Sequence, residues 1–311
     1  MWRACVRLGR RFHEAGRGVT EAVIQDISDT ARWLAHYRAL ESERERPLFR
    51  DPLARRLAGE RGRALAERMP KEPLASSIAV GTRVFDDLIL QALRDHAVHT
   101  VVNLAAGLDT RPYRLDLPAS LRWIEVDQPG LIQAKNALLV NESARCELER
   151  VGLDLKNQGG RGELFARINR ESSRVLVVSE AFLVYLSERE VGALAEDLHG
   201  SFPSALWLLE MFSPAALQQV QESIGKELYA ANAGLKFAPN EGLSFFAKHG
   251  FVPLLQRSLV EEAARLGREM RALTVLRWAS RIAPELVRKL LEEREQSRDA
   301  VVYALMQQRR H

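Results

Sequence analysis

The residues best suited to chemistry lie in one segment, residues 101–127, where two apolar runs each end on groups that can bind a polar ligand. The first run, Val101–Leu104, breaks at Ala105 and Gly107, which is typical of a strand followed by a tight loop. The second run ends on Asp127, 20 residues after Gly107 (127 − 107). A carboxylate at the end of a second strand accepts hydrogen bonds from both hydroxyl groups of a ribose. The spacing therefore predicts a nucleoside-binding site.

The loop between the two runs argues against a dinucleotide. Residues 105–109 read Ala-Ala-Gly-Leu-Asp, whereas a pyrophosphate needs the close backbone approach that G-x-G-x-x-G provides. We therefore expect a nucleoside cofactor without a pyrophosphate. A nicotinamide-dependent oxidoreductase, which would share Asp127, is one alternative, and a non-catalytic nucleoside-binding protein on the same fold is another.

Four motifs follow one another along the chain, and a fifth motif lies upstream of them. They are Leu104–Arg111 (LAAGLDTR), Glu125–Pro129 (EVDQP), Gly152–Leu155 (GLDL) and Ser179–Leu186 (SEAFLVYL), with Thr30–Glu41 and Leu48–Ala54 upstream. In sequence and in order these motifs resemble the leucine carboxyl methyltransferase family. That family includes the tetracenomycin-type polyketide O-methyltransferases and many bacterial enzymes that use S-adenosylmethionine.

The resemblance implies S-adenosylmethionine as the cofactor and assigns residues to its nucleoside. Asp127 would bind the ribose, with Gln128 beside it, and Asp154 would accept the adenine amino group while the amide of Leu155 faces the ring. The backbone of Gly107 would approach the cofactor, as would that of Ala105, which stands where many relatives have glycine. Each has a simpler alternative: Asp127 and Asp154 as turn or helix-cap residues, and Gly107 as a turn glycine.

The methionine end of the cofactor has three predicted partners. Arg83 and Arg38 resemble residues that pair with its carboxylate, a role that suits a guanidinium because it forms two parallel hydrogen bonds. Glu180 follows the apolar run 175–179 and resembles the carboxylate that holds the amino group. The alternative for both arginines is an ordinary surface charge.

Glu180 and Tyr185 are the predicted catalytic residues. Glu180 should stand at the end of a strand beside the methyl-transfer centre, and Tyr185 and Phe182 lie on the following turn. The two aromatic residues either shape the reactive pocket or pack in the core. Phe237, Phe245, Phe246 and Phe251 present the same choice between lining an apolar acceptor site and packing in the core.

The reactivity of the cofactor indicates which chemical class of methyl acceptor to expect. A sulfonium is already a strong methyl donor, so the enzyme mainly aligns the acceptor and excludes water. A carboxylate acceptor is ionised at neutral pH, whereas a phenol, whose pKa in water is about 10, needs a general base. No motif places His36, His199 or His249 at the reaction centre. We therefore predict O-methylation of a small molecule, such as a polyketide-type metabolite, at a carboxylate rather than a hydroxyl, without a metal.

The composition limits the classes of binding partner and the cellular location that we expect. Lys and Arg number 45 against 41 Asp and Glu, a net charge of +4 with both signs scattered, which does not favour nucleic acid. No apolar stretch approaches the roughly 18 residues of a membrane span, so no membrane is expected. Two cysteines cannot build a disulfide framework, which favours a cytoplasmic protein. The sequence makes no prediction of oligomeric state.

Alternating apolar runs and helical stretches predict an α/β fold. We expect a Rossmann-like, mostly parallel seven-stranded sheet with helices on both faces, and its ligand at the carboxyl ends of the strands. Residues 1–18, rich in arginine, are predicted to be an extension, with an amphipathic targeting peptide as the alternative. Residues 19–311 then form one domain. It consists of a helical part at 19–97, a core at 98–260 with a helical insertion near 213–248, and a helical tail at 261–311.

Overall fold

The structure is a computed structural model of the 311-residue chain. It describes residues 27–69, 74–172, 174–230, 233–268 and 300–309. The predicted extension, residues 1–18, lies outside the described residues, and so does the 269–299 part of the predicted tail. Within the described part, no helix combines the length and the apolar character needed to cross a membrane.

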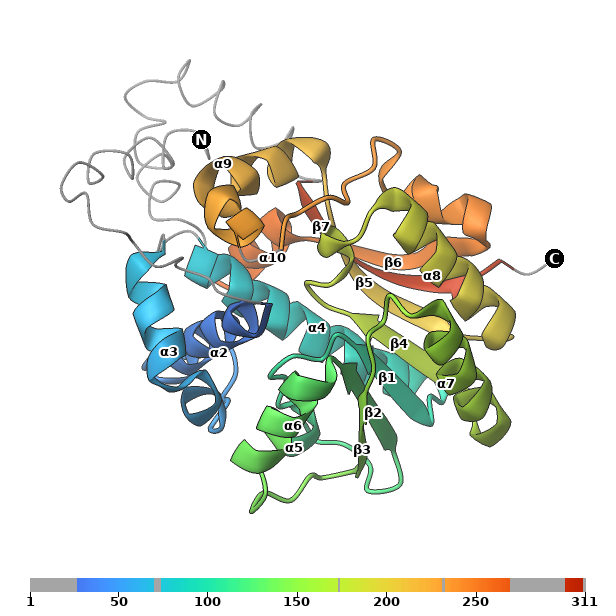
Figure 1. Cartoon of the computed structure of the whole chain (residues 1–311), viewed down its shortest axis with the longest axis horizontal. Helices are drawn as coiled ribbons and strands as arrows, with labels where there is room; N and C mark the ends of the chain where they lie inside the picture. Colours follow the sequence, from blue (N-terminus) through green and yellow to red (C-terminus); the bar gives the residue numbers. More distant parts are fainter. Residues whose placement is uncertain (1–26, 70–73, 173, 231–232, 269–299, 310–311) are drawn as a thin grey trace.

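The described part of the chain contains a seven-stranded sheet of order β3-β2-β1-β4-β5-β7-β6 (Figure 1). β1 to β5 run parallel, and β7 runs antiparallel to both of its neighbours. The predicted α/β, Rossmann-like sheet is confirmed. The strands are β1 (Thr100–Leu104), β2 (Arg122–Asp127), β3 (Glu147–Gly152), β4 (Val175–Ser179), β5 (Leu206–Phe212), β6 (Phe251–Ser258) and β7 (Val301–Gln308).

The prediction of a helical tail over residues 261–311 is wrong at its end, where 301–308 form β7. The sequence Val-Val-Tyr-Ala-Leu-Met suits a strand because β-branched and aromatic residues pack well on a pleated surface. β7 pairs with β5 and β6, which lie far earlier in the chain. Such pairing leaves no local pattern, and the charged residues ahead of β7 dominate the composition of the tail. The start of the tail is helical, in α10 (Leu259–Arg265).

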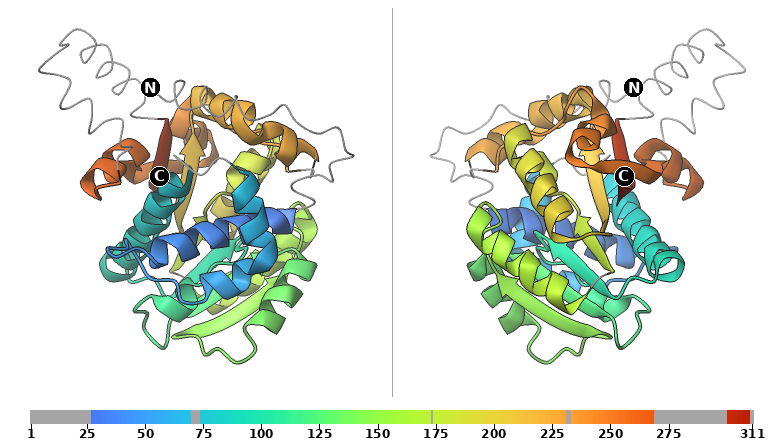
Figure 2. Two further views of the ribbon diagram at one scale, coloured as in Figure 1. Left: turned by 90° about the vertical axis from the view of Figure 1, so that its left-hand side faces the viewer. Right: turned by 90° about the vertical axis from the view of Figure 1, so that its right-hand side faces the viewer.

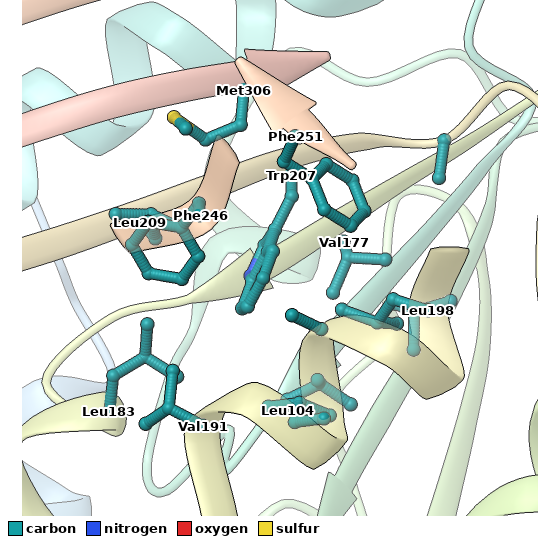
Figure 3. Packing of buried hydrophobic residues seen from close by; sticks show 14 of the residues in the cluster. Leu104, Val177, Leu183, Val191, Leu198, Trp207, Leu209, Phe246, Phe251 and Met306 are labelled. Atoms are coloured by element: carbon teal, nitrogen blue, oxygen red, sulfur yellow. The ribbon is translucent and has the colours of Figure 1, made fainter. Parts of the chain in front are cut away.

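Helices cover both faces of the sheet, each over its own apolar cluster. On one face α4 (Leu74–His96) packs Phe85 and Leu88 against β1, β4, β5 and β7. On the other face α7 and α8 surround Trp207, which contacts the rings of Phe246 and Phe251 edge-on (Figure 3). The remaining elements on the sheet are α5 (Arg111–Arg114), α6 (Pro129–Leu138), α7 (Gln158–Glu171), η2 (Leu183–Tyr185), α8 (Glu188–Ser201) and η3 (Gly242–His249).

Three further helices form a cap beyond the carboxyl ends of the strands. α2 (Ile27–Ser42) and α3 (Ala54–Arg68) pack on each other and belong to the predicted N-terminal helical part. α9 (Pro214–Ala230) comes from the predicted insertion. Its Ile224 and Leu228 pack against Trp33 and Tyr37 of α2, so α2 and α9 close over the sheet together (Figures 1 and 2).

A fully buried ion pair fixes α6 to β2 on the α4 side of the sheet. The ammonium of Lys135 lies 2.8 Å from Glu125 Oε2, and both side chains are 0% exposed. Arg150 also donates to Glu125 Oε2, at 2.8 Å. Since β2 ends on Asp127, the pair helps to hold that carboxylate in place.

We expect Glu125→Ala to destabilise the protein by about 3–5 kcal/mol, because it leaves the Lys135 ammonium buried without a counter-charge. Glu142→Ala is the matched control, since it removes an exposed pair with Arg56 and should cost at most about 1 kcal/mol. Urea unfolding of both variants measures the difference. Equal costs would contradict the structural role of the buried pair.

Candidate active site

One cavity of about 390 Å³ lies at the carboxyl ends of β1 to β5, under the cap. Its floor is the set of loops that follow these strands, and its roof is made by α2, α9 and one face of α4. α4 contributes Leu74, Ser77, Ile78, Gly81 and Thr82, positions that recur every three or four residues. The predicted location of the ligand, at the carboxyl ends of the strands, coincides with this cavity.

Asp127 lines the cavity at the end of β2 and is hydrogen-bonded to the loop after β1. Its Oδ2 accepts the N–H of Gly107 at 2.6 Å, and its Oδ1 accepts the N–H of Gln128 at 2.7 Å. Burial raises the pKa of Asp127, and the two N–H donors oppose that shift. Each carboxylate oxygen keeps an acceptor site facing the cavity, which suits two hydroxyl groups of one ligand.

The loop after β1 has an unusual backbone. Gly107 has φ +51°, and Ala105 has φ +53°, the left-handed region that normally requires glycine. Ala181, directly after Glu180, repeats this feature with φ +50°. Strain of this kind concentrates where a backbone must present groups to a ligand. Both strained alanines line the cavity.

The residues predicted for adenine lie at the β3 end of the cavity. Asp154 is exposed there, and its Oδ1 accepts the N–H of Lys156 at 3.0 Å. Leu155 is buried, and Gln128 lies nearby at the start of α6. The structure thus brings Asp154, Leu155, Gln128 and Asp127 to one end of the cavity.

Glu180 stands at the end of β4, as predicted, and is oriented by an arginine that the sequence analysis did not single out. Arg111 Nη1 donates to Glu180 Oε2 at 2.5 Å and to Asp109 Oδ2 at 2.9 Å, while its Nε donates to Asp86 at 2.7 Å. The guanidinium is almost fully buried. Burial alone would raise the pKa of Asp109, but Arg111, Lys135 and other nearby cations hold it well below its usual range.

The two arginines predicted to bind the methionine carboxylate lie in different places relative to the cavity. Arg38 lines the cavity, where its Nε donates to Asp51 and its Nη2 to the carbonyl of Leu108, leaving Nη1 for a ligand. Arg83 lies off the cavity face of α4. It pairs with Asp87 at 3.0 Å and donates to the carbonyl of Leu48. Arg83 is not among the residues that line the cavity, because residue 83 lies on a different face of the helix from Gly81 and Thr82.

Tyr185 and Phe182 both line the cavity. Burial and the carboxylate of Glu210 raise the pKa of Tyr185 to about 12, so its phenol stays protonated at neutral pH. Glu210, on β5, also lines the cavity and was missed. The signal was available, since Glu210 is a charged residue near the end of an apolar strand, as Asp127 is.

The histidines and phenylalanines considered above lie elsewhere. His36, His199 and His249 are absent from the cavity lining. His249 pairs with Glu196, and His199 packs on Phe251. Phe237, Phe245, Phe246 and Phe251 are core residues that contact one another or Trp207 edge-on. The apolar lining comes instead from the cap, with Trp33, Leu34, Val220, Ile224 and Leu228.

We expect Ala105→Gly to stabilise the unliganded protein by about 0.5–1 kcal/mol, because relief of the left-handed strain exceeds the added freedom of the unfolded chain. Ala106→Gly is the matched control, since Ala106 is buried beside it without a positive φ. That change should destabilise by about 0.5–1 kcal/mol. Thermal or urea unfolding gives both values, and equal losses would contradict the strain.

Comparison with known proteins places this site in a family. The family model for leucine carboxyl methyltransferase matches residues 31–199, more than half of the chain. A candidate S-adenosyl-L-methionine-dependent methyltransferase of Streptomyces avermitilis is 32% identical over 253 residues, covering 77% of this chain and 87% of the relative. One of Streptomyces coelicolor is 31% identical over 256 residues, covering 78% and 89%.

Solved structures support the fold. A DUF574-family protein from Streptomyces avermitilis matches with a TM-score of 0.59 at 13% identity, covering 90% of this chain and 97% of that one. A candidate methyltransferase from Thermobifida fusca matches with a TM-score of 0.55 at 16% identity, covering 76% and 85%. The motifs, the sheet and these matches agree, and the chain belongs to the leucine carboxyl methyltransferase family of S-adenosylmethionine-dependent methyltransferases.

Proposed function

We propose that this enzyme transfers a methyl group from S-adenosylmethionine to an oxygen, of a hydroxyl or a carboxylate, on a small and mostly apolar molecule. The observation that carries the proposal is one continuous cavity with two different ends. Polar groups that suit a nucleoside, among them Asp154 and Asp127, line the end near β3. Apolar side chains of α9, and of the face of α2 that packs against it, line the cavity on the side of η2, which follows β4.

The order of the strands sets the order of cofactor contacts. From β3 to β5 the sheet runs β3-β2-β1-β4-β5, and neighbouring strands are about 4.8 Å apart. Adenine at Asp154 and ribose at Asp127 leave the methionine part to cross the loop after β1. Its amino-acid end then reaches Glu180 and Arg38, which offer a carboxylate and a free guanidinium nitrogen.

Arg111 is a positioning residue in this arrangement. It holds one oxygen of Glu180 and leaves Oε1 to accept from an ammonium group. The donors of Arg111 go to Asp86, Asp109, Glu180 and the carbonyl of Thr82. It is therefore not available to bind an acceptor.

The acceptor end favours an apolar molecule such as a polycyclic polyketide. Trp33, Leu34, Ile78, Val220 and Ile224 supply apolar surface there. The cofactor supplies an electrophilic methyl group when bound. The cap residues exclude water and fix the acceptor oxygen in line with that methyl group, which accounts for much of the rate that a methyltransferase needs.

We expect Asp127→Ala to weaken S-adenosylmethionine binding by about 2–4 kcal/mol, because two hydrogen bonds to a charged acceptor are lost. Titration calorimetry measures the change. Arg83→Gln is the control, because Arg83 lies off the cavity, and it should bind the cofactor as the unmodified protein does. Unchanged affinity in a folded Asp127→Ala variant would contradict the ribose assignment, and weakened binding by Arg83→Gln would contradict the placement of Arg83.

The atom of the product that carries the transferred methyl group tests the proposed O-methylation. The enzyme is incubated with methyl-labelled S-adenosylmethionine and a matched set of 2-naphthol, 2-naphthoic acid and 2-naphthylamine, and mass spectrometry identifies the product. We expect an O-methyl ether or a methyl ester, with S-adenosylhomocysteine formed in equal amount. Label found only on the amine nitrogen or on ring carbon would contradict O-methylation.

A further inference from the structure

Glu210 is a carboxylate in an otherwise uncharged strand. β5 reads Leu-Trp-Leu-Leu-Glu-Met-Phe, and Glu210 lies near its carboxyl end. Its register partner on β7 is Tyr303, so both side chains point to the same face of the sheet. That face is otherwise packed with apolar side chains from α4, β4 and β7. Burial of a charge among apolar side chains lowers the stability of the protein unless the charge is paired and hydrogen-bonded.

The carboxylate of Glu210 has one hydrogen-bond donor among the described residues. Its Oε2 accepts the N–H of Ala181 at 3.1 Å, and Oε1 has no partner among them. The carboxylate lines the cavity, so its unpaired oxygen is open to a ligand. Among the described residues no arginine or lysine pairs with it, because the nearby Arg111 binds Glu180, Asp86 and Asp109 instead.

The groups around Glu210 are acidic or neutral. Glu180 approaches it from the end of β4, Tyr185 from η2 and Tyr303 from β7. Burial and the charge of Glu180 raise the pKa of Glu210 to about 7. Burial and the charge of Glu210 raise the pKa of Tyr185, and burial with the charges of Glu210, Glu180 and Glu262 raises the pKa of Tyr303. Both phenols therefore remain protonated at neutral pH. Glu210 is thus the group here that can change its protonation near pH 7.

The position of Glu210 lies past the expected methionine end of the cofactor. β5 is the strand after β4 in the sheet, so Glu210 is one strand farther from adenine than Glu180. Phe212 and Ala216, which follow it in the chain, line the cavity at the base of α9. Glu210 therefore faces the region between the transferred methyl group and the apolar acceptor end.

We propose that Glu210 is the general base of the reaction and that the acceptor is a neutral hydroxyl compound, an inference that rests on the proposed O-methyltransferase function. Glu210 Oε1 takes the proton as the O–H bond of the acceptor breaks. The oxygen forms a bond to the methyl carbon, and the methyl–sulfur bond breaks with its electron pair staying on sulfur. The products are a methyl ether, S-adenosylhomocysteine and a protonated Glu210, which later returns its proton to solvent.

The same charges disfavour a carboxylate acceptor. A carboxylate acceptor would add a third negative charge beside Glu180 and Glu210, and like charges at close range repel in a low-dielectric site. A neutral hydroxyl meets no such penalty and gains a hydrogen bond to Glu210 before transfer. A base with a pKa near the working pH is also the most effective.

Glu210→Gln is the decisive variant, because the amide oxygen still accepts the N–H of Ala181 but cannot take up a proton. With 2-naphthol as acceptor, we expect kcat of the unmodified enzyme to rise with pH to a plateau. The midpoint of this rise should lie below the pKa of about 7 that Glu210 has in the cofactor-free protein, because the positive charge of the cofactor favours the ionised carboxylate. Glu210→Gln should lower kcat by about 10²–10⁴-fold, change KM less than threefold, and remove the pH limb. Glu210→Asp should restore part of kcat and the limb, whereas Glu196→Gln, an exposed carboxylate outside the cavity, should change neither.

A second measurement does not depend on turnover. Infrared difference spectra of the cofactor-free protein between pH 5 and pH 9 should show a protonated carboxyl stretch that disappears near pH 7. The same spectra of Glu210→Gln should lack that change. Its persistence in the variant, or its absence from the unmodified protein, would overturn the proposal.

The possible results distinguish a failure of the general-base proposal from a failure of the proposed O-methyltransferase function. A methyl ether whose formation by Glu210→Gln is as fast as by the unmodified enzyme overturns the base and leaves O-methylation intact. Methylation of 2-naphthoic acid but not of 2-naphthol overturns the hydroxyl preference alone. Label on nitrogen or carbon contradicts O-methylation itself.

Discussion

The geometry of the active site depends on one buried guanidinium. Arg111 binds Asp86 of α4, Asp109 of the loop after β1 and Glu180 at the end of β4. Each carboxylate comes from a different element, so this single cation joins α4, on one face of the sheet, to the ends of β1 and β4. An unpaired charge at a buried site costs several kcal/mol of stability. Displacement of any of the three elements would leave such an unpaired charge. The loop that carries Gly107, and through it the hydrogen bond to Asp127, is fixed by the same network.

The sequence predicts those parts of the site that lie in local motifs. Apolar runs that end on Asp127 and Glu180 identified two strand ends correctly, because a buried strand and the polar residue after it are adjacent in the chain. Arg83 does not line the cavity, and a motif match says nothing about which face of a helix a residue occupies. Its i,i+4 pair with Asp87 was the available signal. β7 was missed because it pairs with strands that lie far earlier in the chain. Glu210 was missed although a charged residue near the end of an apolar run is a local signal.

Backbone strain occurs at corresponding places on two neighbouring strands. Ala105 follows β1 and Ala181 follows β4, and both adopt the left-handed conformation. At Ala105 the turn lets Gly107 present its N–H to Asp127, and at Ala181 it presents the N–H to Glu210. In both cases a strained alanine lies in the loop whose backbone N–H binds a carboxylate from a neighbouring strand. The hydrogen bond between the amide and the carboxylate stabilises the turn that contains the strained alanine. This helps to explain how the strain is maintained.

The protonation of Glu210 is coupled to the charge of its neighbours. Burial and the charge of Glu180 raise the pKa of Glu210, since two carboxylates close together resist double ionisation. In the proposed complex, an ammonium group at Glu180 and a positive sulfur nearby would offset this repulsion, so Glu210 would lose its proton more readily than in the cofactor-free protein. Methyl transfer then removes the positive charge from sulfur, and the affinity of Glu210 for a proton rises at the moment when the acceptor releases one. A base arranged in this way is ionised before the reaction and holds the proton after it, which disfavours the reverse transfer.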